Sequence, residues 1–138
     1  MAISGTSDGE LAAIKASAIS YLTAFNRADA AAVVANYADD GVLMAPARPA
    51  VVGKDKLAMV YPKVFEAVGF DMTYDIKEVV QISAEWAFVR SATEGTETIK
   101  ATGEVQPAQY QELFLLRKST VGAWQIARYC TCKIVPMF

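Results

Sequence analysis

The chain contains no histidine among its 138 residues, and this absence narrows its chemistry more than any other feature of its composition. Without imidazole, the commonest general base at neutral pH is missing. Catalytic Ser-His and Cys-His pairs are excluded, and zinc or non-haem iron sites, which usually need His ligands, are disfavoured. We therefore expect no metal and no cofactor. Any catalysis must use carboxylates, tyrosines, arginine, lysine or cysteine.

Long apolar runs and basic clusters are absent as well. No stretch approaches the roughly 18 apolar residues that span a bilayer, and no Lys/Arg cluster indicates a nucleic-acid surface. The first residues lack a basic region followed by an apolar stretch, which disfavours a signal peptide. The formal net charge is only −2. These features predict a cytoplasmic protein whose partners include neither a membrane nor a nucleic acid.

Cysteine is scarce, and the two present are Cys130 and Cys132. Their C-x-C spacing is not the C-x-x-C of redox or zinc motifs. On a strand both side chains point to the same face, and we interpret them as small apolar residues of a buried strand.

Hydrophobic residues make up 54% of the chain, which is long enough to bury one core without disulfides or metals. We predict a flexible N-terminus at residues 1–7 and a single domain at residues 8–138. Ser7 and Glu10 fit a capping box, and an apolar stripe at spacings of three and four follows. The pattern predicts helices over 8–26, over 30–38 with a stop at 39–41, and from Gly53 to Gly69, with a kink or new turn at Pro62.

After Gly69 the hydrophobic period changes from helical spacing to two. We predict a short strand at 42–45, four longer strands, and a loop over 100–108. The four strands are expected at 72–82, 86–94 with a continuation to 99, 110–118 and 123–135. Helices gathered before a meander of strands favour an α+β fold, in which the helices cover a curved, mainly antiparallel sheet. Such a layer leaves a hollow where ligands commonly bind.

Three stretches carry a resemblance to a known family: YLTAFN at 21–26 with Asp29, NYADDG at 36–41, and GAWQIARYC at 122–130. Together with VGKDKL at 52–57, they resemble ketosteroid isomerase-like and SnoaL-like domains of the NTF2-like superfamily, most of all the SgcJ/EcaC-like branch. The resemblance implies a cone of about three helices on a curved sheet that encloses one pocket. It also implies a small hydrophobic ligand and a homodimer formed through the sheet.

Residue by residue, the resemblance implies an incomplete isomerase site. The oxyanion-binding tyrosine falls on Tyr21, two supporting tyrosines on Tyr37 and Tyr61, and the protonated acid near Glu112. The catalytic base falls on Ala45, whose methyl group cannot move a proton, so steroid isomerisation by the usual route is not expected. In the alternative interpretation, Tyr21 and Tyr61 are core aromatics and Glu112 faces solvent.

One face of the strand that starts at Trp86 also carries Phe88, Arg90, Ala92 and Glu94, because strand side chains alternate. By comparison with the isomerases we expect this face to line the pocket. Arg90 would then orient the substrate, and Glu94 or a bound water would replace the missing base. The alternative is an ion pair of Arg90 with Glu94 or Glu112. The Asp-Arg-Asp set of limonene epoxide hydrolases is not matched.

Alternation does not show which face of the last strand points inward, because both faces carry a mixture of apolar and polar residues. Arg128 shares a face with Trp124, Ile126 and Cys130, and we expect this more apolar face to pack against a partner subunit or on the rest of the sheet. Arg128 is included among the candidate ligand-binding residues.

Two functions remain open at this point. One is a cofactor-free isomerase, cyclase or dehydratase acting on a small hydrophobic or polyketide-like ketone. Its predicted site combines four catalytic residues and a set of ligand-binding residues. The catalytic set is Tyr21, Glu112, Arg90 and Glu94; the binding set is Tyr37, Tyr61, Phe65, Trp86, Phe88, Phe114 and Arg128. The other is a non-catalytic small-molecule-binding or dimeric assembly module. An enzyme should hold Glu112 or Glu94 in a closed pocket with a perturbed pKa.

Overall fold

The structure is a computed structural model that describes residues 7–135. Residues 1–6, most of the segment predicted to be flexible, and residues 136–138 lie outside the described part. Three helices and six strands follow one another within residues 7–135. In order they are α1 (Asp8–Asn26), α2 (Ala30–Ala35), β1 (Tyr37–Met44), β2 (Val51–Val52), α3 (Lys54–Ala67), β3 (Val68–Gln81), β4 (Trp86–Ile99), β5 (Glu104–Lys118) and β6 (Trp124–Lys133).

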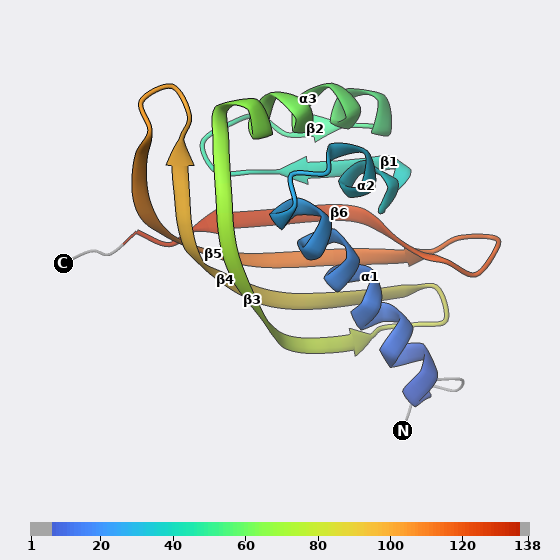
Figure 1. The fold of residues 1–138 in the computed structure, drawn as a ribbon. Coiled ribbons are helices and arrows are strands. Elements are labelled where there is room, and N and C mark those ends of the chain that lie inside the picture. Colours follow the sequence, from blue (N-terminus) through green and yellow to red (C-terminus); the bar gives the residue numbers. More distant parts are fainter. Residues whose placement is uncertain (1–6, 136–138) are drawn as a thin grey trace.

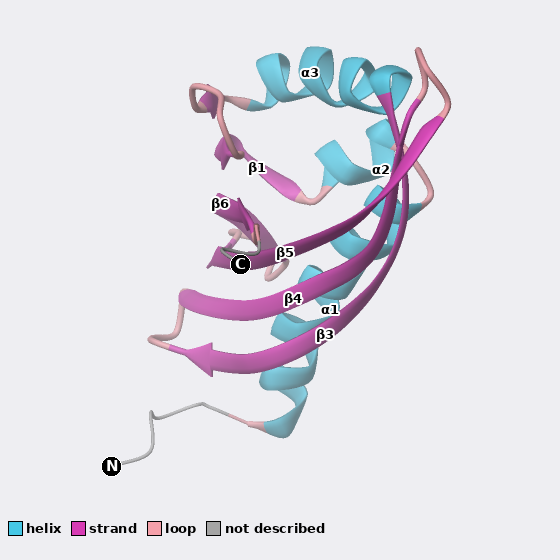
Figure 2. Cartoon of the chain, turned by 90° about the vertical axis from the view of Figure 1, so that its left-hand side faces the viewer, coloured by secondary structure: helices cyan, strands magenta, loops and turns pink. Residues whose placement is uncertain are grey.

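The strands form one sheet in the order β2-β1-β6-β5-β4-β3, with β2 and β3 as its edges. Every neighbouring pair is antiparallel except β1 and β6, which run parallel. Figures 1 and 2 show the long strands β3, β4 and β5 curving around α1, while α2 and α3 lie over the other end of the sheet. The predicted α+β architecture, three helices on a curved and mainly antiparallel sheet, is confirmed.

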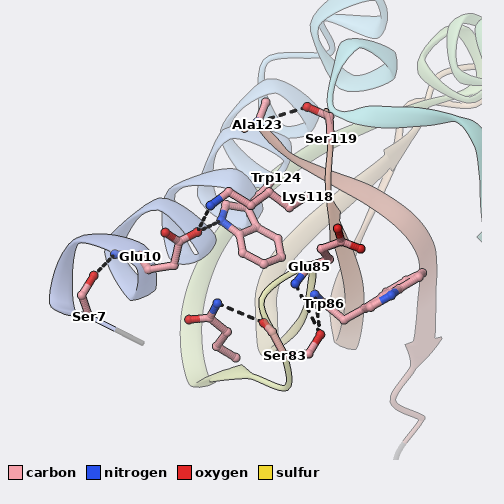
Figure 3. A network of polar contacts seen from close by, with 10 residues as sticks. Ser7, Glu10, Ser83, Glu85, Trp86, Lys118, Ser119, Ala123 and Trp124 are labelled. Atoms are coloured by element: carbon pink, nitrogen blue, oxygen red, sulfur yellow. Dashed lines mark hydrogen bonds and ion pairs between the residues drawn. The ribbon is translucent and has the colours of Figure 1, made fainter. Parts of the chain in front are cut away.

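The N-terminal helix is tied to the last strand by a side-chain network (Figure 3). The Ser7 hydroxyl accepts a hydrogen bond from the Glu10 backbone N–H at 3.1 Å, which is half of the predicted capping box. The Glu10 carboxylate instead accepts from the indole N–H of Trp124 at 2.7 Å and pairs with Lys118 at 2.9 Å. These contacts join residues more than a hundred positions apart and fix α1 across the sheet.

The predicted end of the second helix is wrong. We expected residues 36–38 to be helical and 39–41 to form a stop, but α2 ends at Ala35 and β1 begins at Tyr37. The parallel pairing of β1 with β6 explains the difference, because it gives these backbone groups ladder partners that no local pattern shows.

The predicted loop over 100–108 is also shorter than expected. Only residues 100–103 connect β4 to β5, and β5 already begins at Glu104. Pro107 pairs with Thr96 of β4. This part of β5 lies beyond the end of β6, so it has a free edge, where the missing N–H of proline is tolerated.

Three smaller expectations have different outcomes. Pro62 lies inside α3, which continues through it. Cys130 is half-buried and Cys132 is exposed, so the pair does not belong to a buried strand surface. Among residues 7–135, no helix combines the length and the apolar character needed to cross a membrane.

Candidate functional site

A cavity of about 400 Å³ lies between the inner face of the sheet and the helices. Its walls come from α1, α3, β1 and the loop after it, and strands β3 to β6. Most of the lining is apolar, with contributions such as Leu22, Phe25, Val64 and Phe70. Strands β4, β5 and β6 contribute a group of polar side chains: Thr93, Glu97, Tyr110, Glu112, Tyr129, Thr131 and Lys133.

Three tyrosine hydroxyls form a chain at one wall of the cavity. Tyr61 is the central member: its hydroxyl lies 2.6 Å from that of Tyr21 and 2.7 Å from that of Tyr37. Tyr21 and Tyr61 line the cavity, while Tyr37 is fully buried behind them. Burial is the main cause that raises the pKa of all three phenols well above the ordinary value. They are therefore neutral hydrogen-bonding groups at physiological pH.

Glu112 is a buried acid on the floor of the cavity, with 4% of its surface exposed. One carboxyl oxygen accepts from the Ser91 hydroxyl at 2.7 Å and the other from Thr93 at 2.8 Å. Burial raises the pKa of Glu112, and these two hydrogen bonds only partly oppose that rise. The alternative interpretation, in which Glu112 faces solvent, is therefore wrong.

A second buried acid, Glu97, lines the same cavity in a different environment. It accepts hydrogen bonds from the Gln106 amide at 3.0 Å and the Tyr110 hydroxyl at 2.7 Å, and it pairs with Lys133. Burial acts to raise the pKa of Glu97, but the three donors outweigh it and lower the pKa. The cavity therefore holds one carboxyl that favours its neutral form and one that is held ionised.

The face of β4 that we expected to line the cavity points the other way. Arg90 is exposed and its guanidinium pairs with Glu78 on the neighbouring strand β3 at 2.9 Å, not with Glu94 or Glu112. Glu94 is exposed too, and Trp86 and Phe88 are half-buried on the same outer face. None of the four lines the cavity.

Packing of α1 on the sheet explains why the inner face of β4 is the one opposite to our expectation. The inward side chains of β4 include Ala87, Val89, Ser91 and Thr93, which are small. Helix α1 packs against β3 and β4, and small side chains on the inner face of β4 let it come close to the sheet. The larger aromatic residues of β4 therefore lie outside.

The last strand shifts its register at Ala127, which corrects the expectation for Arg128 and its neighbours. Leu115 pairs with Arg128 and Leu116 with Ile126, so one residue of β6 is extra. The shift places Trp124 and Ile126 in the core while Arg128 is exposed. Arg128 donates to the backbone carbonyl of Asp40 at 3.1 Å and does not line the cavity.

Other predicted binding residues lie one layer behind the cavity. Phe65 packs on Phe25, with ring centroids 5.1 Å apart, and Phe114 is fully buried with its ring stacked on Tyr129 at 4.5 Å. Neither lines the cavity, whereas Ala45, at the position of the usual base, does.

Sequence reasoning missed Arg48, Glu97, Tyr110 and Lys133, all of which line the cavity. Tyr110 could have been found, because it shares the β5 face of Glu112 by alternation. Nothing local connects Glu97 with Lys133, since only the sheet brings these distant positions together. Among residues 7–135, no group of three His, Cys, Asp or Glu side chains has the arrangement of a metal site.

Comparisons with known proteins agree with this geometry. A model of the SnoaL-like domain family matches residues 18–121. A search of curated proteins gave no match. The chain is 74% identical to a ketosteroid isomerase-like protein from Erwinia carotovora atroseptica SCRI1043, with a TM-score of 0.92. That alignment covers 94% of this chain and 100% of the other.

More distant solved structures share the fold alone. A domain of unknown function with a cystatin-like fold from Nostoc punctiforme superimposes with a TM-score of 0.75 at 14% identity, covering 96% of this chain and 82% of that one. An NTF2-like protein from Novosphingobium aromaticivorans gives a TM-score of 0.67 at 12% identity, covering 89% and 80%.

Proposed function

The chain belongs to the SnoaL-like domain family, and from this membership and the cavity geometry we propose that it binds a small hydrophobic ketone and stabilises an oxyanion formed from it. The reaction class is an isomerisation, cyclisation or dehydration without a cofactor, in which a bound water takes the proton that leaves the carbon next to the carbonyl, because Ala45 cannot. The observation that carries the proposal is Glu112, a carboxyl group buried in a mainly apolar cavity that Tyr21 also lines. Burial favours the neutral form of this carboxyl group, and a neutral carboxyl group can donate a hydrogen bond.

The tyrosine chain supplies a second donor. Three hydroxyls carry three protons, and the two hydrogen bonds among them use only two. When Tyr37 donates to Tyr61 and Tyr61 donates to Tyr21, the Tyr21 proton remains for a ligand oxygen. Donors placed where negative charge develops stabilise it strongly in a site from which water is excluded.

Ala45 supports a second function, a binding module without catalysis. It lines the cavity where a proton-abstracting carboxylate would stand in the isomerases. Among the described residues, the other carboxyl in the lining is Glu97, which is held by three donors and is therefore a weak base. Binding and catalysis must therefore be measured separately.

Binding is tested with 2-naphthol, whose ionised form mimics an enolate. We expect the wild-type protein to bind it with an increased naphtholate fraction, seen in its fluorescence. Tyr21→Phe is expected to weaken naphtholate binding by about 10- to 100-fold, because a hydrogen bond to a charged group contributes roughly 1.5–3 kcal/mol. The control is Tyr74→Phe, another tyrosine of the lining. Equal binding by Tyr21→Phe and wild type would refute the oxyanion site.

Catalysis is tested by exchange of the α-hydrogens of 2-tetralone in D₂O, followed by NMR. Exchange that depends on the protein and falls in Tyr21→Phe supports the enzyme. Binding of 2-naphthol without any exchange would instead favour the non-catalytic module.

We also propose that the outer face of the sheet forms a homodimer. Leu113 of β5, Cys130 of β6 and Met44 of β1 are direct cross-strand neighbours on that face. Leu113 and Met44 are 46% and 41% exposed, so they form an apolar row open to a partner.

Leu113→Lys should disrupt this dimer, because it replaces an exposed leucine of the apolar row by a charge, next to Arg90 on the neighbouring strand β4. Light scattering after size-exclusion chromatography is expected to show a dimer for the wild type and a monomer for the variant. Val121→Lys, in the exposed turn before β6, serves as the control. A wild-type monomer at high concentration would disprove the dimer.

A further inference from the structure

A lysine with one hydrogen-bond acceptor among the described residues stands at one end of the cavity, and the proposed function does not use it. Lys133 is the last residue of β6 and lines the cavity beside Tyr110, its cross-strand partner. Its ammonium pairs with Glu97 and lies 5.7 Å from the ring centroid of Tyr110. An ammonium group has three N–H donors, and Glu97 is the only hydrogen-bond acceptor that Lys133 has among residues 7–135. Two donors therefore remain.

Glu97 fixes where those donors point. Its carboxylate is itself held by Tyr110 and Gln106, and the Glu97 residue is 4% exposed. Because the carboxylate already accepts three hydrogen bonds, it positions Lys133 and has little capacity left to bind a ligand. Lys133 is thus a prearranged cation, with about a third of its side chain exposed (33%).

The cavity brings two cations close to the ligand space. Among the described residues its lining contains two cations, Arg48 and Lys133, and two carboxyls, Glu97 and Glu112. In the neutral state of Glu112 that the proposed function requires, two positive charges face one negative charge, which favours an anion. The loop that carries Arg48 leaves β1 at Met44, opposite Cys130 of the parallel strand β6, so both cations belong to the same end of the sheet.

From these observations, and resting on the proposed function, we propose that Lys133 binds a carboxylate of the ligand, so that the substrate class is a small hydrophobic keto acid. Glu112 pairs with Thr131, which lies two residues before Lys133. Two residues of a strand span about 7 Å. Glu112 and Lys133 therefore lie on neighbouring strands, offset by two residues, and both line the cavity, so one elongated ligand can contact both side chains.

A matched pair of ligands tests this proposal: 6-acetyl-2-naphthoate and its neutral isostere 6-acetyl-2-naphthamide. Calorimetry with the full chain at pH 7 is expected to show about 10-fold or tighter binding of the acid. Lys133→Met should weaken the acid by about 10- to 100-fold and change the amide by less than about 3-fold, as expected for loss of one charge-assisted hydrogen bond. Lys77→Met removes an exposed lysine, paired with Asp75, outside the cavity lining and is the control.

A second variant controls for misfolding, because Lys133→Met leaves the buried Glu97 without its paired cation and could destabilise the fold. The double variant Glu97→Gln/Lys133→Met removes both charges together, and it too should lose the preference for the acid. If the amide binds as tightly as the acid in the wild type, the carboxylate site is wrong while the ketone site stands. If neither ligand binds, both proposals are overturned.

Discussion

Replacing Gly95 with alanine is expected to lower the free energy of unfolding by about 3 kcal/mol or more, the upper range for overpacking. Gly95 lies in β4 opposite Met72 of β3. A Cβ atom at this position would lie 2.0 Å from the backbone oxygen of Asp71 and 2.9 Å from the Cα of Met72. Backbone atoms of a paired strand cannot move aside without breaking the ladder.

Urea denaturation followed by circular dichroism measures this effect. Gly69→Ala is the matched control, because Gly69 lies in β3 and a Cβ atom there would meet only side-chain atoms at 3.8 Å. The control is expected to be neutral or slightly stabilising, since alanine restricts the unfolded chain. Equal stability of the two variants would mean that the close approach of the β3 backbone to Gly95 does not exclude a side chain there.

Glu97→Gln is expected to lower the free energy of unfolding by about 2–3 kcal/mol at pH 7, because it weakens charge-assisted hydrogen bonds from Lys133 and Tyr110. The sign with pH follows from the lowered pKa of Glu97. The ionised form favours folding, and this contribution is present above the ordinary pKa of glutamate and disappears as the pH falls through the lowered value. The difference in the free energy of unfolding between wild type and Glu97→Gln should therefore become smaller as the pH is lowered.

Glu112→Gln is the internal comparison, because the pKa of Glu112 is raised rather than lowered. The protonated form favours folding here, so its contribution is complete below the ordinary pKa of glutamate and is lost as the pH rises through the raised value. Relative to wild type, Glu112→Gln should gain stability as the pH rises from 4 to 8. Parallel pH curves for the two variants would contradict the assignment of one neutral and one ionised acid.

The helices and most of the strands could be predicted from local pattern. A capping serine and an apolar stripe predicted α1, which begins and ends at the expected residues. The errors fall where distant segments decide the structure. The run of residues 37–41 looks like a helix end, yet it is a strand because β6 lies beside it.

The candidate site also combines residues that the sequence predicted with residues that only the folded sheet brings together. Tyr21, Tyr61 and Glu112 were identified through the family resemblance, and all three line the cavity. The inward face of β4 was misjudged, because alternation defines two faces but does not say which one a helix covers. Lys133 and Glu97 were missed, because their pairing exists only once the sheet has formed.

The position of β6 has a consequence for how the protein is made. Although it is the last strand among residues 7–135, it lies between β1 and β5 in the interior of the sheet. A growing chain whose residues 124–133 are still inside the ribosome therefore exposes two strand edges that have no partner, and Glu10 of α1 lacks the indole that it binds. Productive folding of the sheet has to wait until residues 124–133 have emerged, and chains that stop short of Trp124 present open edges suited to aggregation.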